Sequence, residues 1–177
     1  MNKRLLVFIA FTLAGWTFGL LDSRIPMPTS STALWAGNLG APWLVLPFCA
    51  GWAQGAKRWP LASGALTCTA AMVGFFGPGS GWGPASVAFV AGWIAVGALA
   101  GGLYGRFGFA WGRSRALLEG LALAVPFILE PLAWRWGLGY SQGPPIRNAE
   151  LAAGLALLVY VVCASRRRAL PGRTAVS

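Results

Sequence analysis

Two carboxylates lie inside one otherwise apolar segment, and they are the side chains best suited to chemistry. The chain has four acidic residues in 177, and Glu119 and Glu130 both fall between Arg115 and Trp136. An ionisable group in the middle of a bilayer costs roughly several kcal/mol, so it is expected to face a partner, a cavity or a pathway. Eleven residues separate the two carboxylates, which at about 100° per residue places them on one side of a helix and about 16 Å apart. We therefore expect a helix with a polar stripe.

The residue types argue against an enzyme. The chain has no histidine, which excludes the Ser–His pair of serine proteolysis and a histidine-bound zinc protease. Two carboxylates about 16 Å apart along a helix cannot act together as an aspartyl dyad. The three cysteines fall in or at the ends of apolar stretches, where cysteine packs as a small apolar residue. We expect no catalytic residue, no cofactor and no metal.

Composition indicates an integral membrane protein. Hydrophobic residues make up 56% of the chain and charged residues 10%, against about 25% charged in soluble domains. The net charge of +10 would suit nucleic acid only if the basic residues gathered on one soluble face. They lie between apolar runs instead, so we expect no nucleic acid and take the lipid bilayer as the partner. The expected location is a bacterial plasma (inner) membrane.

Six apolar stretches predict an all-α membrane protein with six transmembrane helices in a single domain, residues 1–168. The first stretch follows a basic N-terminus, as in a signal peptide, but the small-x-small cleavage pattern is missing, so we retain it as a helix. Residues 169–177 are expected to form a disordered cytoplasmic tail. The expected helices cover residues 5–21, 32–53, 61–76, 85–104, 116–138 and 149–164.

Lysine and arginine are unevenly distributed between the two sides that six helices would create. Eleven lie on the side of the termini and three on the other, and the cytoplasmic side of a membrane protein carries the excess. Both termini are therefore expected in the cytoplasm. Arg166–Arg168 would then anchor the last helix at the cytoplasmic surface, within reach of anionic lipid.

Two proline pairs share one pattern. Pro42-Trp-Leu-Val-Leu-Pro47 and Pro126-Phe-Ile-Leu-Glu-Pro131 each run proline, aromatic, two aliphatics, one further residue, proline. Each proline removes a backbone donor and is expected to bend its helix. Two interpretations remain open. The halves are inverted three-helix repeats with a site near their interface, as in many transporters, or the kinks are unrelated.

Glycines at four-residue spacing mark one helix for close packing. Gly97, Gly101 and Gly105 share a face of the expected helix 85–104. Small residues at this spacing let two helix backbones approach closely. We expect a partner helix on this face.

The candidate binding site combines Glu130 with Asn38. With the expected helix ends, Asn38 lies about 9 Å and Glu130 about 12 Å below the outer surface. Matching depth on two proline-bent helices predicts a pocket with oxygen acceptors and one negative charge, which suits a cation. Glu130→Gln would then abolish cation binding with little effect on folding. The further candidates for solute binding are Trp35, Trp134 and Glu119.

Each candidate also has a structural interpretation. A protonated Glu130 hydrogen-bonded to Asn38 needs no solute. Glu119 follows Arg115 by four residues, which suits an ion pair near the cytoplasmic surface. The tryptophans suit interfacial anchoring. We predict a protein that binds or transports a small solute, with a cation as the preferred class; the alternatives are a structural or assembly membrane protein and a small ion channel.

Three resemblances accompany these patterns. In size, six-helix topology and tryptophans near the outer helix ends, the chain resembles the substrate-binding S components of energy-coupling-factor vitamin transporters. Asn38 in Gly-Asn-Leu-Gly is similar to the pore asparagine segment of small fluoride channels, although those have four helices and a phenylalanine box that is absent here. The segment 37–43, GNLGAPW, resembles small multi-pass membrane proteins of actinobacterial type with no assigned function. That resemblance implies a fold and a location, and no activity.

Overall fold

The computed structural model is all-helical apart from two very short strands. It describes residues 3–25, 33–34, 40–54, 59–77, 87–137, 141–142 and 144–169. Six helices lie in these ranges: α1 (Lys3–Asp22), α2 (Ala41–Ala53), α3 (Pro60–Phe76), α4 (Val87–Ser114), α5 (Leu117–Gly137) and α6 (Pro144–Ala169). The strands β1 (Ala33–Leu34) and β2 (Ser141–Gln142) pair in parallel, with Ala33 opposite Ser141. The expected tail, residues 169–177, lies outside the described residues from 170 onward.

The second helix is shorter than expected, and its start has a local cause. Residues 33–34 form a strand, and α2 begins at Ala41 rather than at residue 32. Pro42 lies in the first turn of α2, where a proline is tolerated because the first amide groups of a helix have no partner within it. Pro42 therefore starts a helix instead of bending one, and that part of the prediction is wrong. Pro47 lies inside α2, as expected.

Two other helices are longer than expected. α4 continues from Tyr104 to Ser114, because Gly105 and Gly108 do not end it but contact other backbones. A Cβ atom at Gly105 would overlap the carbonyl oxygen of Pro60, and one at Gly108 that of Phe48. α6 begins five residues before the expected start, with two prolines in its first turn.

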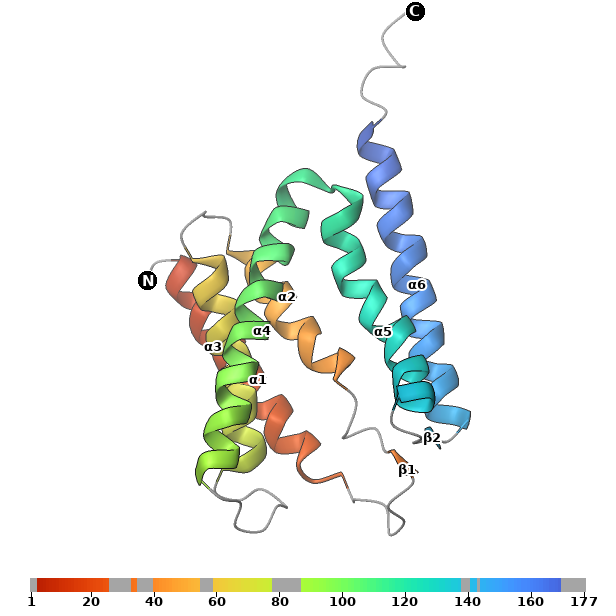
Figure 1. Cartoon of the computed structure of the whole chain (residues 1–177). Coiled ribbons are helices and arrows are strands. Elements are labelled where there is room, and N and C mark those ends of the chain that lie inside the picture. Colours follow the sequence, from red (N-terminus) through yellow and green to blue (C-terminus); the bar gives the residue numbers. More distant parts are fainter. Residues whose placement is uncertain are drawn as a thin grey trace, which may run out of the picture.

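The helices form a group of four with a hairpin beside it. α3 packs against α1 and α4, α2 packs against α3 and α4, and α5 pairs with α6 (Figure 1). Successive helices run in alternating directions, so the start of α1 and the end of α6 lie at the same end of the bundle (Figure 1). We call this the basic end, because the last turns of α4 and α6 bring Arg113 and Arg166–Arg168 there. The paired strands lie at the other end.

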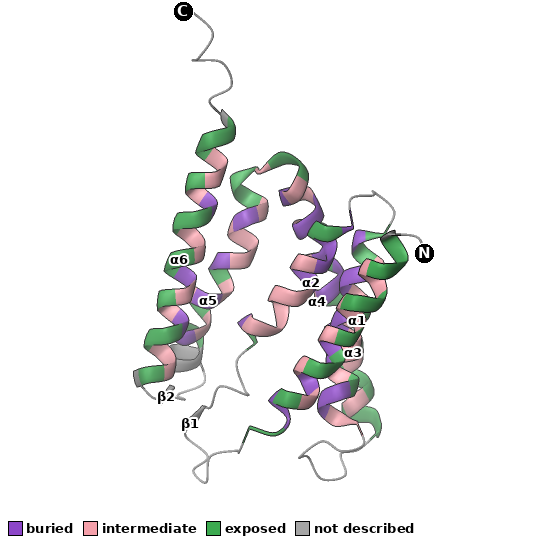
Figure 2. Ribbon diagram, turned by 180° about the vertical axis from the view of Figure 1, so that it is seen from behind, coloured by how far each residue is buried: buried purple, intermediate pink, exposed green. Residues whose placement is uncertain are grey.

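Three helices are long and apolar enough to cross a membrane. They are α1 over Arg4–Asp22, α4 over Val87–Ser114 and α6 over Pro145–Arg168; α2 and α3 are shorter apolar helices. Large apolar side chains remain exposed on the outside of the bundle, such as Leu99 with 78% of its surface accessible. Figure 2 shows exposed residues along the outer faces of these helices. Apolar surface of this kind is typical of helices that face lipid.

The partner of the α4 glycines is α3 of the same chain. A Cβ atom at Gly101 would lie 2.5 Å from the Cβ atom of Cys68, and one at Gly97 would lie 3.0 Å from Cγ of Met72. Gly51 of α2 meets the same glycine face from another side, where an added Cβ atom would overlap the Gly105 carbonyl oxygen. Small residues thus let three helix backbones meet at one point.

An apolar cluster connects the hairpin to the four-helix group near the basic end. Phe48 of α2, Trp111 of α4 and Val161 of α6 are all at least 98% buried and contact one another. Gly120 of α5 lies against Val161 and the Trp111 ring, where a side chain would not fit. The tight packing fixes one end of α5, and the candidate site described below fixes the other.

Candidate functional site

Glu130 of α5 makes two hydrogen bonds to the start of α2. Its Oε1 atom accepts a hydrogen bond from the Gly40 amide at 2.5 Å, and its Oε2 atom accepts one from the Ala41 amide at 2.6 Å. Glu130 is half-buried, and the two amides precede it by 90 and 89 residues. The contact therefore joins two helices that are distant in the sequence.

The chemistry of a helix start explains this arrangement. The first amide groups of a helix have no acceptor within it, and the aligned peptide dipoles leave about half a positive charge there. Gly40 precedes α2 and has no side chain that could cap it. A carboxylate from another helix supplies both acceptors and the complementary negative charge. An added Cβ atom at Gly40 would stand 3.5 Å from Oε1 of Glu130, so the carboxylate lies directly against this backbone.

A second carboxylate contacts the side chain of Trp43, a residue in the first turn of α2. Asp22, the last residue of α1, is 7% exposed and accepts a hydrogen bond from the Trp43 side chain. The Trp43 ring is held edge-on by Phe18 of α1 and Phe75 of α3, each with a ring centroid at 5.3 Å. The Oδ2 atom of Asp22 is buried and has no hydrogen-bond partner among the described residues. We call Asp22, Trp43, Glu130 and the amides of Gly40 and Ala41 the carboxylate site.

A family of unknown function (DUF6518) matches residues 2–177. The chain belongs to this family. No curated protein and no solved structure matches it. Because the DUF6518 description assigns no activity, function has to be argued from the carboxylate site itself.

The predicted site residues of this DUF6518 chain have different outcomes. Glu130 lies at the carboxylate site. Asn38 and Trp35 lie outside the described residues, as does the side chain of Trp134, so their predicted roles stay predictions. Glu119 lies in the first turn of α5, about 16 Å along the helix from Glu130, and does not belong to this site.

The expected Arg115–Glu119 ion pair is wrong. Arg115 precedes α5 and has a φ of 52°, so the two residues do not have the spacing of successive turns of one helix. The Arg115 guanidinium instead lies over the rings of Trp52 and Trp111, 4.9 and 5.1 Å from their centroids. The Oε2 atom of Glu119 is buried without a hydrogen-bond partner in the described part of the chain.

Sequence reasoning missed Asp22 and a buried polar cluster. Asp22 follows the expected helix 5–21 and precedes a proline-rich stretch, which is typical of a loop residue; its rarity as one of four acidic residues is the available signal. In the cluster, Nε2 of Gln54 donates to Oγ of Ser63 at 3.3 Å, and Oγ1 of Thr67 donates to the Ser63 carbonyl at 2.8 Å. All three residues are buried and connect α2 with α3.

The carboxylate site offers the oxygen atoms of two carboxyl groups. No group of three histidine, cysteine, aspartate or glutamate side chains that could hold a metal ion occurs among the residues the structure describes. The site has two carboxylates, one indole N–H group and the positive end of a helix. Such groups suit the binding of a cation or of a solute with hydrogen-bond donors.

Proposed function

We propose that the chain is an integral membrane protein with six spanning helices and cytoplasmic termini that binds or transports a small cationic solute at the carboxylate site. One observation carries the proposal: Asp22 of α1 and Glu130 of α5 both contact the first turn of α2. α2 begins partway along the bundle, whereas its neighbours extend further toward the strand end (Figure 1). Transporters commonly place ion and substrate sites at helices that start inside the membrane.

The carboxyl oxygens favour a cation over an anion. Asp22 and Glu130 bring two carboxyl groups to the first turn of α2. Charges interact more strongly in apolar surroundings than in water, so a cation would be attracted to an ionised carboxyl group here. Oδ2 of Asp22 is an oxygen without a partner among the described residues, so it can accept from a solute without breaking a bond.

The structural alternative rests on the same residues. Both oxygens of Glu130 already accept backbone hydrogen bonds, so Glu130 can serve only to fasten the α5–α6 hairpin to α2. In that case the protein needs no solute, and its exposed faces would contact other membrane components.

The two proline pairs, on which the predicted inverted repeat depends, lie at different places in their helices. Pro126 and Pro131 both lie inside α5, whereas only Pro47 lies inside α2 and Pro42 starts it. The two proline pairs therefore act differently on their helices. The chain length and the six helices support a resemblance in size and helix number to the S components of vitamin transporters.

Thermal unfolding with added cations tests the proposal. Purified protein in detergent is heated with alkali cations, alkylammonium ions and small polyamines at constant ionic strength. A bound solute at about 100 times its Kd stabilises by about 2.7 kcal/mol. We expect at least one cation to raise the Tm by several degrees. The substitution Asp22→Asn should raise the Kd for that cation at least tenfold.

Glu119→Gln is the matched control, because it removes a carboxylate from the same protein outside the carboxylate site. It should leave the cation effect unchanged. If no cation raises the Tm beyond the effect of ionic strength, the structural alternative is favoured. An equal loss in Asp22→Asn and Glu119→Gln would show that the effect does not arise at the carboxylate site.

A further inference from the structure

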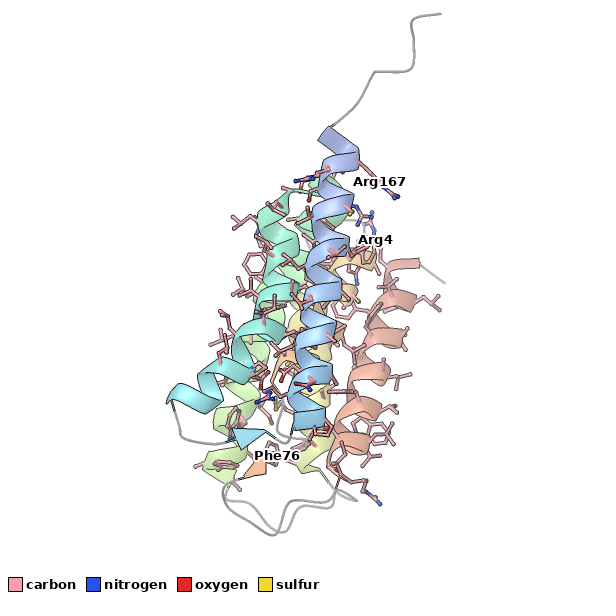
Figure 3. The ribbon with its side chains drawn as sticks, turned by 90° about the vertical axis from the view of Figure 1, so that its right-hand side faces the viewer. Arg4, Phe76 and Arg167 are labelled. Atoms are coloured by element: carbon pink, nitrogen blue, oxygen red, sulfur yellow. The ribbon has the colours of Figure 1, made fainter. Side chains whose placement is uncertain are left out.

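The last turns of α4 and α6 are held together at the basic end. Nη1 of Arg168 donates a hydrogen bond to the backbone carbonyl of Arg113, 55 residues earlier. The Arg113 guanidinium lies over the Phe109 ring, 5.4 Å from its centroid. Both arginine side chains are exposed. Figure 3 shows Arg4 and Arg167 at this same end and Phe76 at the other.

This arrangement gathers positive charge without a counter-charge from any carboxylate that the structure describes. None of the described carboxylates pairs with Arg113, Arg115 or Arg168, whose contacts are aromatic rings, a hydroxyl and a backbone carbonyl. Oε2 of Glu119, the carboxylate nearest to Arg115 in the sequence, has no hydrogen-bond partner among the described residues. Like charges held close together are unfavourable unless an anion lies between or beside them. An anion from outside the chain would relieve this repulsion.

The depth of these residues matches that of lipid phosphates. α4 has 28 residues and α6 has 26, which correspond to about 42 and 39 Å at 1.5 Å per residue. The hydrocarbon core of a bilayer is about 30 Å thick, so the helix ends extend into the headgroup layer. Trp52 and Tyr160 are exposed near the same end and contact Arg115, as expected of aromatic residues at a membrane surface.

We propose that Arg113 and Arg168 bind the headgroup phosphate of an anionic phospholipid. The bound phosphate would hold the end of α6 against the end of α4. A guanidinium group can donate two parallel hydrogen bonds to two oxygens of one phosphate. Tyr160, exposed on α6 about two turns before Arg168, provides an apolar surface for an acyl chain. A soluble phosphate would use the arginines but not this surface, so the arrangement favours a lipid.

Native mass spectrometry and thermal unfolding of the full chain test the site. Delipidated protein in neutral detergent receives phosphatidylglycerol, phosphatidylcholine or glycerol phosphate. We expect phosphatidylglycerol to remain bound and to raise the Tm, and the other two to do neither. The double variant Arg113→Gln/Arg168→Gln should retain at least fivefold less phosphatidylglycerol.

Two variants control for folding and for net charge. Arg4→Gln/Arg106→Gln removes the same charge from exposed positions and should bind within twofold of the unchanged protein. Arg113→Lys/Arg168→Lys keeps the charge and should recover part of the binding. The proposal is overturned if phosphatidylcholine binds equally, if both glutamine doubles lose binding equally, or if glycerol phosphate stabilises as much as the lipid.

Discussion

Oε2 of Glu130 accepts a hydrogen bond from the amide of Ala41 at 2.6 Å, across 89 residues of sequence. The bond joins a side chain in the interior of α5 to the first residue of α2. It gives Glu130 a structural task even if a solute also binds there. Substitutions of Glu130 therefore change stability and binding together, whereas Asp22, with one oxygen unpaired among the described residues, separates the two better.

Removal of the Glu130 carboxylate should destabilise the fold. Glu130→Ala leaves two amides without acceptors and is expected to lower the free energy of unfolding by about 3 kcal/mol. Glu130→Gln keeps one oxygen acceptor and should cost about 1–2 kcal/mol. The sequence alone predicts that Glu130→Gln has little effect on folding. Because of the two hydrogen bonds, we expect this variant to be destabilised instead. Thermal unfolding in detergent measures both variants, and a Glu130→Gln protein as stable as the unchanged chain would contradict the capping role.

Side chains added where helix backbones meet should separate the helices. Gly51→Ala and Gly108→Ala each place a methyl group on a carbonyl oxygen of a neighbouring helix, and each is expected to cost several kcal/mol, roughly, as an overpacked core does. Gly92→Ala is the control in α4, because an added Cβ atom there has no atom within 4 Å. It should be neutral or stabilise by up to about 1 kcal/mol. Equal Tm values for all three would refute the close packing.

The backbone of Arg115 should favour glycine over alanine once the side chain is lost. Arg115 has a φ of 52°, a conformation that costs a residue with a Cβ atom about 1 kcal/mol relative to glycine. Arg115→Ala and Arg115→Gly both lose the contacts with Trp52 and Trp111. We expect Arg115→Gly to be the more stable of the two by about 1 kcal/mol. Chemical or thermal unfolding of the pair checks this, and the opposite order would exclude the left-handed conformation.

Cysteine labelling should assign the two ends of the bundle to opposite sides of the membrane. In a background without Cys49, Cys68 and Cys163, cysteine replaces Ile25 after α1 or Ser114 at the end of α4, both exposed. With cytoplasmic termini, a membrane-impermeant thiol reagent should reach position 25 in intact cells and position 114 only after lysis. Labelling of both positions in intact cells would contradict the proposed orientation.

The sequence by itself determined the helices and the importance of Glu130. Apolar stretches predict helices because every backbone group inside a membrane must be paired within its segment, and all six expected helices correspond to helices of the structure. A carboxylate in an apolar segment requires a partner, so Glu130 could be singled out without knowing what it contacts.

Only the tertiary structure decided the partners, because contacts between helices leave no periodic pattern in the sequence. The amides of Gly40 and Ala41 became the partners of Glu130 only where Pro42 starts a helix beside α5. Arg115 and Glu119 have the spacing of an ion pair, yet the chain turns at Arg115 and its guanidinium meets two tryptophan rings. Asp22 resembles a loop residue until the packing of α1 against α2 buries it beside Trp43.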